Sequence, residues 1–332
     1  MRKRVLSEDA YVEGITSGDR SVLARAITLV ESERVSDAAL ASRILTRTLP
    51  LGGRAYRVGV SGVPGVGKST FIDAFGTLLT EEGFKVAVLA VDPSSTISGG
   101  SILGDKTRMP RLSRDPSAFV RPSPTGGTLG GVARKTQESM LLCEAFGFDV
   151  VLVETVGVGQ SEIMVSEMVD FLLGLMLAGA GDGLQGIKRG ILEVVDMVAV
   201  NKADGENVLA AQRARKEYEL ALSLLRAGED KWMPPVQTCS ARAGTGLREL
   251  WEAIQTHRNR FEAELNQLRG RQAVRWMWRL VEDSLSYELK SAWNVREVTP
   301  GIEAKVASGE LPPTLAANEL LGAFRAFLDS ER

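Results

Sequence analysis

Residues 62–70 read Gly-Val-Pro-Gly-Val-Gly-Lys-Ser-Thr and fit the G-x-x-x-x-G-K-[ST] pattern of a phosphate-binding loop. The run YRVGVS at residues 56–61 is short and valine-rich, which predicts a strand entering the loop. Residues 70–79 have the apolar spacing of a helix leaving it. A strand, this loop and a helix in succession predict a nucleotide site in an α/β fold. The alternative is a glycine-rich turn without a ligand.

The residue types in this loop suit a ligand that carries several negative charges. Glycines let consecutive backbone N–H groups turn inward around a phosphate, and the helix N-terminus adds the positive end of its dipole. Lys68 is expected to reach the β- and γ-phosphates, and the Ser69 hydroxyl can bind Mg²⁺. The residues expected to contact the nucleotide here are Gly62, Val63, Pro64, Gly65, Val66, Gly67, Lys68, Ser69 and Thr70.

Bulk composition excludes several classes of protein. The 332 residues carry a net charge of -2, which indicates neither a nucleic-acid-binding nor a membrane-binding protein. Two cysteines make a disulfide framework improbable and fit a reducing compartment, so we expect a cytoplasmic location. The longest apolar run, residues 171–180, is too short to span a membrane and fits a buried strand. The single histidine, His257, lies in a polar helical stretch and is expected to be a solvated surface residue.

The pattern along the chain predicts three segments. Residues 1–50 are helical, with apolar spacing at 21–33 and 36–46. Residues 51–256 alternate short apolar runs with helical stretches, which predicts a doubly wound, mostly parallel sheet. The expected strands are 56–61, 86–91, 118–121, 150–154, 171–177, 195–201 and 236–239.

Residues 257–332 are helical again. An apolar stripe ends in a break that contains proline and glycine, and a last helix is expected near residues 314–328. Trp276, Trp278 and Trp293 lie in this segment. Such aromatic surface packs either on the main domain or on a second subunit.

Asn201-Lys202-Ala203-Asp204 follows an apolar run and has the N-K-x-D pattern of guanine-specific proteins. A carboxylate only accepts hydrogen bonds, and guanine presents N1–H and N2–H₂ as adjacent donors, so Asp204 can accept both. Adenine would leave this carboxylate unpaired. Ser240-Ala241, after another short strand, fits the loop whose backbone meets the guanine oxygen. The expected nucleotides are GTP and GDP.

Three carboxylates are candidates for the Mg²⁺ site. Glu154 begins the stretch Glu-Thr-Val-Gly, where a Ras-like GTPase has D-x-x-G, and the Gly157 N–H can face the γ-phosphate. Asp92 ends a predicted strand, and Asp105 lies in a loop rich in glycine and serine. Each carboxylate could instead be a turn or cap residue.

The hydrolysis machinery of Ras-like proteins is incomplete in this chain. Val158 stands where those proteins place the glutamine that orients the attacking water, and Gln160 is too far along to be assumed equivalent. We therefore predict slow intrinsic hydrolysis that a partner or an ordered loop accelerates. The glycine-rich stretch 178–190, with Asp182, Gln185 and Lys188, is a candidate for coupling the nucleotide state to a partner. Its alternative is a long surface loop.

The motifs taken together resemble the MeaB/ArgK family of P-loop GTPases. The resemblance covers about residues 20–290 and is carried by the stretches GVPGVGKST, VDPSS with SGGSILGDKTRM, RPSPTGGTLGGV, ETVGVGQSE, AGAGDGLQGIKRG and NKAD.

The resemblance implies a chaperone for adenosylcobalamin-dependent acyl-CoA mutases, chiefly methylmalonyl-CoA mutase, that gates cofactor loading and protects the mutase. It implies a homodimer formed through the C-terminal helical extension. It also implies that Lys68, Ser69, Asp92, Asp105 and Glu154 form the Mg²⁺–phosphate site, and that Lys188 lies in a loop responding to the mutase.

Two other functions compete with this one. A kinase linked to basic amino-acid transport would need a second substrate pocket and a base, and the sequence indicates neither. A GTPase that delivers nickel or zinc would need exposed histidine or cysteine ligands, and one histidine with two scattered cysteines argues against it.

Overall fold

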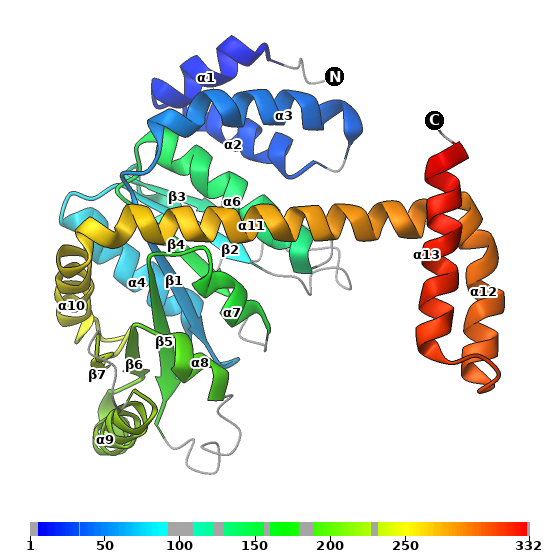
Figure 1. The fold of residues 1–332 in the computed structure, drawn as a ribbon. Helices are drawn as coiled ribbons and strands as arrows, with labels where there is room; N and C mark the ends of the chain where they lie inside the picture. Colours follow the sequence, from blue (N-terminus) through cyan, green and yellow to red (C-terminus); the bar gives the residue numbers. More distant parts are fainter. Residues whose placement is uncertain are drawn as a thin grey trace. The chain divides into compact units, whose positions relative to one another are not determined.

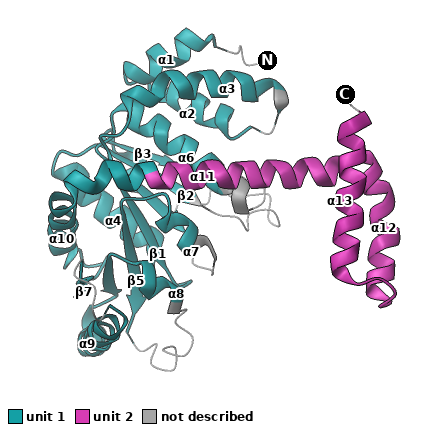
Figure 2. Cartoon of the chain, viewed as in Figure 1, with its two compact units in different colours: residues 1–270 teal, residues 271–332 magenta. Residues whose placement is uncertain are grey.

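The structure, a computed structural model, describes residues 6–32, 34–91, 109–122, 129–155, 160–178, 189–226 and 232–330 (Figure 1). The chain divides into two compact units, residues 1–270 and 271–332 (Figure 2). The first unit contains the N-terminal helices together with the sheet. The second contains the last part of a long helix and two further helices.

A seven-stranded parallel sheet forms the centre of the first unit, which confirms the predicted fold class. Its spatial order is β3-β2-β4-β1-β5-β6-β7, so the strand that enters the phosphate loop lies in the middle. The strands are β1 (Tyr56–Gly62), β2 (Val86–Val91), β3 (Ala118–Arg121), β4 (Val150–Thr155), β5 (Phe171–Leu177), β6 (Met197–Asn201) and β7 (Val236–Thr238). All seven predicted strands are present; β2, β3 and β5 have the predicted bounds, and the other four differ from theirs by one or two residues at one end.

Helices cover both faces of the sheet, because successive strand residues point to opposite faces and both faces are apolar. On one face Val58 and Val60 of β1 pack with α4 (Lys68–Glu81) and α10 (Leu247–Arg260). On the other face Val151 and Val153 of β4 pack with helices that connect successive strands. These helices are α6 (Leu129–Phe146), α7 (Gln160–Ser166), α8 (Arg189–Val194) and α9 (Val208–Leu225).

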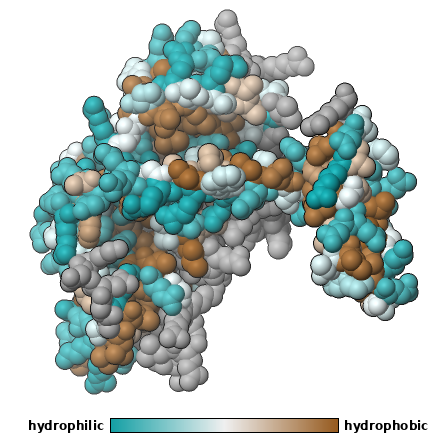
Figure 3. Space-filling model, viewed as in Figure 1, coloured by the Kyte–Doolittle hydropathy of each residue, from teal (hydrophilic) through white to brown (hydrophobic). Residues whose placement is uncertain are grey.

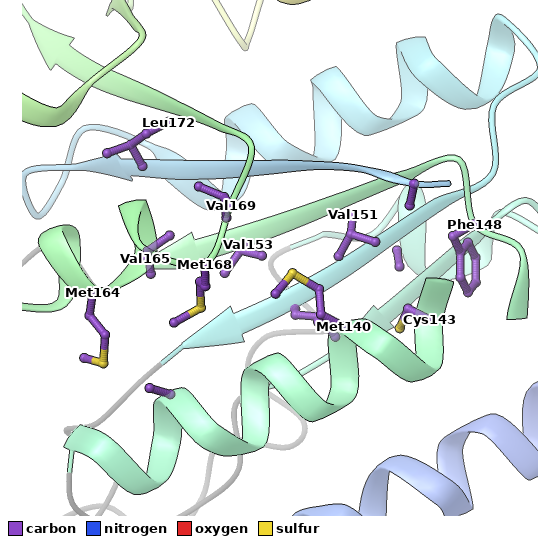
Figure 4. Close-up of a cluster of buried hydrophobic side chains, with 14 of the residues drawn as sticks. Met140, Cys143, Phe148, Val151, Val153, Met164, Val165, Met168, Val169 and Leu172 are labelled. Carbon is purple, nitrogen blue, oxygen red and sulfur yellow. The ribbon is translucent and has the colours of Figure 1, made fainter. Parts of the chain in front are cut away.

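Methionine side chains are prominent in the core beneath α6 and α7. Figure 4 shows Met140 and Cys143 on α6 directed toward Val151 and Val153 of the sheet, with Met164 on α7 at the side. The N-terminal helices α1 (Glu8–Thr16), α2 (Arg20–Val30) and α3 (Val35–Thr48) belong to the same buried cluster. Helix α6 is therefore held between the sheet and the N-terminal helices.

Two buried ion pairs join the chain segments at the amino end of β1. Arg57 Nε lies 2.6 Å from Glu144 Oε1 on α6, and Arg269 Nη2 lies 2.5 Å from Asp170 Oδ2 just before β5. Both carboxylates have fully buried side chains. Arg269 also donates to the carbonyls of Gly53 (2.7 Å) and Ala55 (2.6 Å), in the segment that leads into β1.

His257 is buried, so the prediction of a solvated surface residue was wrong. It is 8% exposed, and its Nδ1 lies 2.9 Å from the Tyr56 hydroxyl. The rings of Phe171, Trp232 and Phe261 surround the imidazole. Burial, followed by the charge of Arg260, lowers the pKa of His257 to about 4, so the ring is neutral at pH 7. The prediction failed because the residues next to His257 in the sequence are polar, although His257 itself lies on the buried face of α10.

The C-terminal helices are α11 (Glu262–Ser291), α12 (Trp293–Ala307) and α13 (Pro313–Ser330). The predicted break that contains proline and glycine lies between α12 and α13, at residues 308–312, which include Gly309 and Pro312. Helix α12 itself continues through Pro300 and Gly301. Proline removes one backbone hydrogen bond, and the turns on either side keep theirs. Helix α13 was predicted close to its observed bounds.

The second unit has an apolar surface. Trp278 on α11 is 58% exposed and Trp293 on α12 is 65% exposed. Val274, Met277, Val281 and Leu285 are further exposed apolar residues of α11. Figure 3 shows hydrophobic surface on the C-terminal helices. None of the helices in the described part of the chain is long and apolar enough to cross a membrane.

Replacing Arg269 with methionine should destabilise the first unit. Arg269→Met keeps much of the side-chain volume but leaves the buried Asp170 carboxylate without its ion pair, which costs about 3–5 kcal/mol in the free energy of unfolding. The matched control is Arg215→Met, which removes an exposed pair with Glu219 and should cost about 0.3–0.5 kcal/mol. Urea denaturation measures both, and equal losses would contradict a special role for the buried pair.

The stability contributed by His257 should depend on pH. The folded-state pKa lies below the ordinary value of 6.5, so the unfolded state binds more protons between pH 6.5 and about 4. Stability is therefore lost as the pH falls through this window, by about 3–4 kcal/mol in all. The His257→Asn variant lacks this titration. The comparison is made in an Asp196→Asn background, because Asp196, whose pKa burial raises to about 7, lies 3.9 Å from His257 Nε2 and titrates in the same range. Subtracting the unfolding free energy of the His257→Asn variant then isolates the loss. If the difference in unfolding free energy between the two proteins stayed constant from pH 7.5 to 4.5, the lowered pKa of His257 would be contradicted.

Candidate functional site

The phosphate loop lies between the carboxyl end of β1 and the start of α4, as predicted. Gly62 is the last residue of β1, and a Cβ there would come within 2.4 Å of the Leu175 carbonyl oxygen on β5. Gly67 precedes α4 with φ 93°, in the left-handed region that glycine adopts most easily. The close packing at Gly62 and the backbone conformation of Gly67 therefore explain why this loop needs glycine at both ends.

Lys68 folds back over the loop. Its Nζ donates to the Gly62 carbonyl at 2.7 Å and to the Val63 carbonyl at 3.4 Å, and the residue is 9% exposed. Val66 is buried beneath the loop. The other predicted contact residues Val63, Pro64, Gly65 and Thr70 are exposed. The structure thus places a buried ammonium group beside exposed loop residues, an arrangement suited to an anionic ligand.

Ser69 and Glu154 are brought together from α4 and β4. The Ser69 hydroxyl donates to Glu154 Oε1 at 2.9 Å, across 85 residues of sequence. Because β4 pairs with β1, with Glu154 opposite Val60, the carboxylate stands beside the loop.

A hydroxyl and a carboxylate are oxygen ligands of the kind that Mg²⁺ takes alongside phosphate oxygens and waters, so this pair fits the ion. The described residues contain no group of three or more histidine, cysteine, aspartate or glutamate residues that could hold a metal by themselves. Asp92, Asp105 and Gly157 lie outside the described residues, as do Val158 and the loop residues Asp182, Gln185 and Lys188.

Asn201 joins the phosphate loop to the predicted guanine loop. Its Nδ2 donates to the Val66 carbonyl at 2.9 Å, and its Oδ1 accepts from the Ala241 N–H at 3.2 Å. The Cys239 thiol lies 3.7 Å from the same oxygen. Asn201 is 2% exposed, so these groups satisfy one another in the interior. A single side chain thereby holds together three segments that are far apart in the sequence.

Lys202 adds a second connection to the phosphate loop. Its Nζ donates to the Gly65 carbonyl at 2.8 Å. Lys202 has φ 61°, and among the described residues it is the one non-glycine residue with a positive φ. Such a conformation is uncommon and often marks a functional site. Here it turns the chain sharply at the end of β6.

Asp204 lies beside the loop that follows β7. Its carboxylate accepts a hydrogen bond from the Ser240 hydroxyl, which in turn accepts from the Ala243 N–H at 3.0 Å. Asp204 is only partly buried. The structure therefore brings Asn201, Lys202, Asp204, Ser240 and Ala241 into one neighbourhood, as predicted.

Sequence reasoning missed two supporting features. Asn207 donates from Nδ2 to the Lys202 carbonyl at 2.7 Å and so holds the turn that carries Asp204. Ser61 and Thr155 form a buried hydroxyl pair at the ends of β1 and β4. Neither feature belongs to a motif; the Ser61–Thr155 pair depends on which strands are neighbours, which local sequence does not show.

A protein-family model described as "Methylmalonyl Co-A mutase-associated GTPase MeaB" matches residues 23–294. The chain belongs to the MeaB family of GTPases. The match confirms the family resemblance inferred from the motifs, and the described geometry agrees with a P-loop GTPase fold.

Individual relatives of this MeaB-family chain cover nearly all of it. A "Putative GTPase" of Caulobacter vibrioides is 52% identical over 321 residues, covering 96% of this chain and 98% of the relative. The "Methylmalonic aciduria type A homolog, mitochondrial" of Mus musculus is 48% identical over 330 residues, covering 96% of this chain and 80% of the relative. A solved structure described as "Crystal structure of LAO/AO transport system kinase" is 38% identical with a TM-score of 0.78, and the match covers 97% of this chain and 100% of that one.

Removing the Asn201 side chain should weaken the connection between the two loops. Asn201→Ala leaves the buried Val66 carbonyl and Ala241 N–H without these partners, at a cost of about 1–3 kcal/mol each. We expect a lower unfolding free energy and weaker nucleotide binding, measured by urea denaturation and by titration with a fluorescent guanine nucleotide. Ser223→Ala, which removes an exposed hydrogen bond to the Leu220 carbonyl within α9, is the control. Unchanged values for Asn201→Ala would contradict the connecting role.

Proposed function

We propose that this protein is a GTP-binding chaperone with slow GTP hydrolysis that serves an adenosylcobalamin-dependent acyl-CoA mutase, methylmalonyl-CoA mutase in the first place. In this role it gates cofactor loading and protects the mutase from inactivation. The observation that carries the proposal is the neighbourhood of Asp204, Asn201 and the phosphate loop in a chain of the MeaB family.

Guanine recognition depends on the chemistry of Asp204. An ionised carboxylate accepts both donors on the Watson–Crick edge of guanine, and the Ser240 hydroxyl already orients it. When the base binds, Asp204 accepts from it, Asn201 holds the surrounding loops, and the Lys202 stem lies along the ring. The backbone around Ala241 completes the guanine pocket. GTP and GDP are therefore the proposed nucleotides.

The phosphate end would use the groups gathered around the loop. Lys68 would bind the β- and γ-phosphates, and Ser69, Glu154, Asp92 and Asp105 would hold Mg²⁺. A bound Mg²⁺ would supply positive charge for the phosphate oxygens during hydrolysis. The Gly157 N–H is proposed to contact the γ-phosphate. Because valine at 158 cannot orient a water molecule, hydrolysis by the protein alone is slow.

The mutase and the dimer are proposed from the relatives and from the C-terminal segment. The family description names a methylmalonyl-CoA mutase-associated GTPase, and the mouse relative is named for methylmalonic aciduria. Residues 257–332 are proposed as a dimerisation extension, because exposed side chains such as Trp278 and Trp293 offer apolar area for a second subunit. The loop containing Lys188 would couple the mutase to the nucleotide, and the location would be cytoplasmic.

A kinase is the second candidate, and the kinase name of the similar solved structure favours it. A kinase would transfer the γ-phosphoryl group to an acceptor hydroxyl on a second substrate, whereas a chaperone GTPase transfers it to water. The two functions therefore differ in where the phosphorus atom goes. That difference is directly measurable.

The test is GTP turnover with γ-labelled nucleotide, with and without purified methylmalonyl-CoA mutase. We expect the protein alone to turn over at less than about 1 s⁻¹, in the range of unassisted GTPases. We expect co-purification with the mutase, faster turnover in its presence, and label only in inorganic phosphate. The Lys68→Ala variant should lose turnover and serves as the control for contaminating GTPases.

Each other outcome decides against a particular part of the proposal. Label on a protein or a metabolite would favour the kinase. Neither binding to the mutase nor stimulation by it would overturn the partner. Equal turnover of ATP and GTP would overturn the assignment of Asp204 to guanine recognition.

A further inference from the structure

Ser61 and Thr155 occupy corresponding places at the carboxyl ends of two neighbouring strands. Ser61 is the penultimate residue of β1, and Thr155 is the last residue of β4. The Thr155 hydroxyl donates to Ser61 Oγ at 3.0 Å, and the two residues are 1% and 0% exposed. The registered pairing of the strands runs up to Val60 and Glu154, so this bond lies one residue further toward the phosphate loop.

The last two residues of β4, Glu154 and Thr155, have side chains on opposite faces of the sheet. Successive side chains point to opposite faces of a sheet. Glu154 is directed toward α4, where its carboxylate accepts from the Ser69 hydroxyl at 2.9 Å. Thr155 is directed to the other face, where it meets Ser61. The backbone that carries Glu154 is therefore tied to β1 at the next residue.

The same holds on the β1 side. Ser61 immediately precedes Gly62, whose carbonyl accepts from Lys68 Nζ at 2.7 Å. A Cβ on Gly62 would meet the Leu175 carbonyl oxygen at 2.4 Å, so the backbone at this point has little room to shift toward β5. The hydroxyl pair thus joins the constrained start of the phosphate loop to the strand end that presents Glu154.

We propose that Ser61 and Thr155 are positioning residues of the nucleotide site, whose hydrogen bond sets the spacing between Ser69 and Glu154 and hence the affinity for Mg²⁺ in the presence of nucleotide. The inference rests on the proposed function, because it takes these two groups as Mg²⁺ ligands. Neither hydroxyl touches the nucleotide or the ion in this assignment. Each acts through the backbone of the residue next to it.

The test measures release of a fluorescent GDP at a series of Mg²⁺ concentrations and in excess EDTA. Thr155→Val removes the donor hydroxyl and keeps the branched side chain. Ser61→Ala removes the acceptor hydroxyl and otherwise leaves the side chain unchanged. Thr155→Ser keeps the donor hydroxyl. Thr48→Val is the matched control, since Thr48 is 0% exposed and its hydroxyl donates within the α3 segment, to the Ile44 and Leu45 carbonyls.

Thr155→Val and Ser61→Ala should raise the Mg²⁺ concentration needed to slow release by at least about fivefold, because one buried hydroxyl loses its partner and the strand ends separate. Release in EDTA should stay within about twofold of the wild type, since base recognition does not use the pair. Thr155→Ser and Thr48→Val should follow the wild type. The double variant Ser61→Ala/Thr155→Val should show less than the combined effect, because the two residues share one bond.

Two results would overturn the inference alone. One is an unchanged Mg²⁺ dependence in both Ser61→Ala and Thr155→Val, and the other is an equal shift in Thr48→Val, which would make the effect one of general stability. Ser61→Ala decides the question if Thr155→Val does not fold. The proposed function, and the inference with it, would be overturned if the wild type did not retain GDP or if its rate of GDP release did not depend on Mg²⁺.

Discussion

Two buried ion pairs at the amino end of β1 constrain the whole first unit. Glu144 and Asp170 have no exposed side-chain surface, and a buried carboxylate without a partner is strongly destabilising. Arg57 of β1 and Arg269 of α11 provide those partners. The pairs therefore require that α6, the central strand, the start of β5 and the start of α11 meet at one place. The strand held in this way is the one that ends in the phosphate loop.

At the opposite end of the sheet, the nucleotide edge is held by hydrogen bonds from side chains to backbone. Asn201 and Lys202 reach the Val66 and Gly65 carbonyls, and Lys68 reaches the Gly62 carbonyl. These donors shape a loop that has no regular secondary structure of its own. In this loop the Asn201 amide and the ammonium groups of Lys68 and Lys202 bond to backbone carbonyls, which in the sheet bond to neighbouring strands. The same bonds connect the phosphate loop to the predicted guanine loop.

Several features of the fold could be predicted from the sequence. Continuous apolar runs flanked by helical periodicity indicated buried parallel strands, and the spacing of Gly62, Gly67 and Lys68 indicated the loop. Predictions failed where a local pattern and the tertiary environment disagree. His257 has polar neighbours in the sequence, yet α10 turns it toward Tyr56 and three aromatic rings.

The sequence by itself determined the family, because its motifs have the spacing and the residue types of a P-loop GTPase. It also predicted the residues of the nucleotide site, such as Lys68, Asn201 and Asp204, from the chemistry of their side chains. It also determined the fold class, through the alternation of buried strands and amphipathic helices. Only the tertiary structure decided which strands are neighbours. The bonds between Ser69 and Glu154, between Ser61 and Thr155, and between Arg269 and Asp170 all depend on that order, since each joins segments at least 85 residues apart. The spacing of apolar residues shows which face of a helix or strand is buried. Which other helix or strand packs against that face depends on how the complete chain folds.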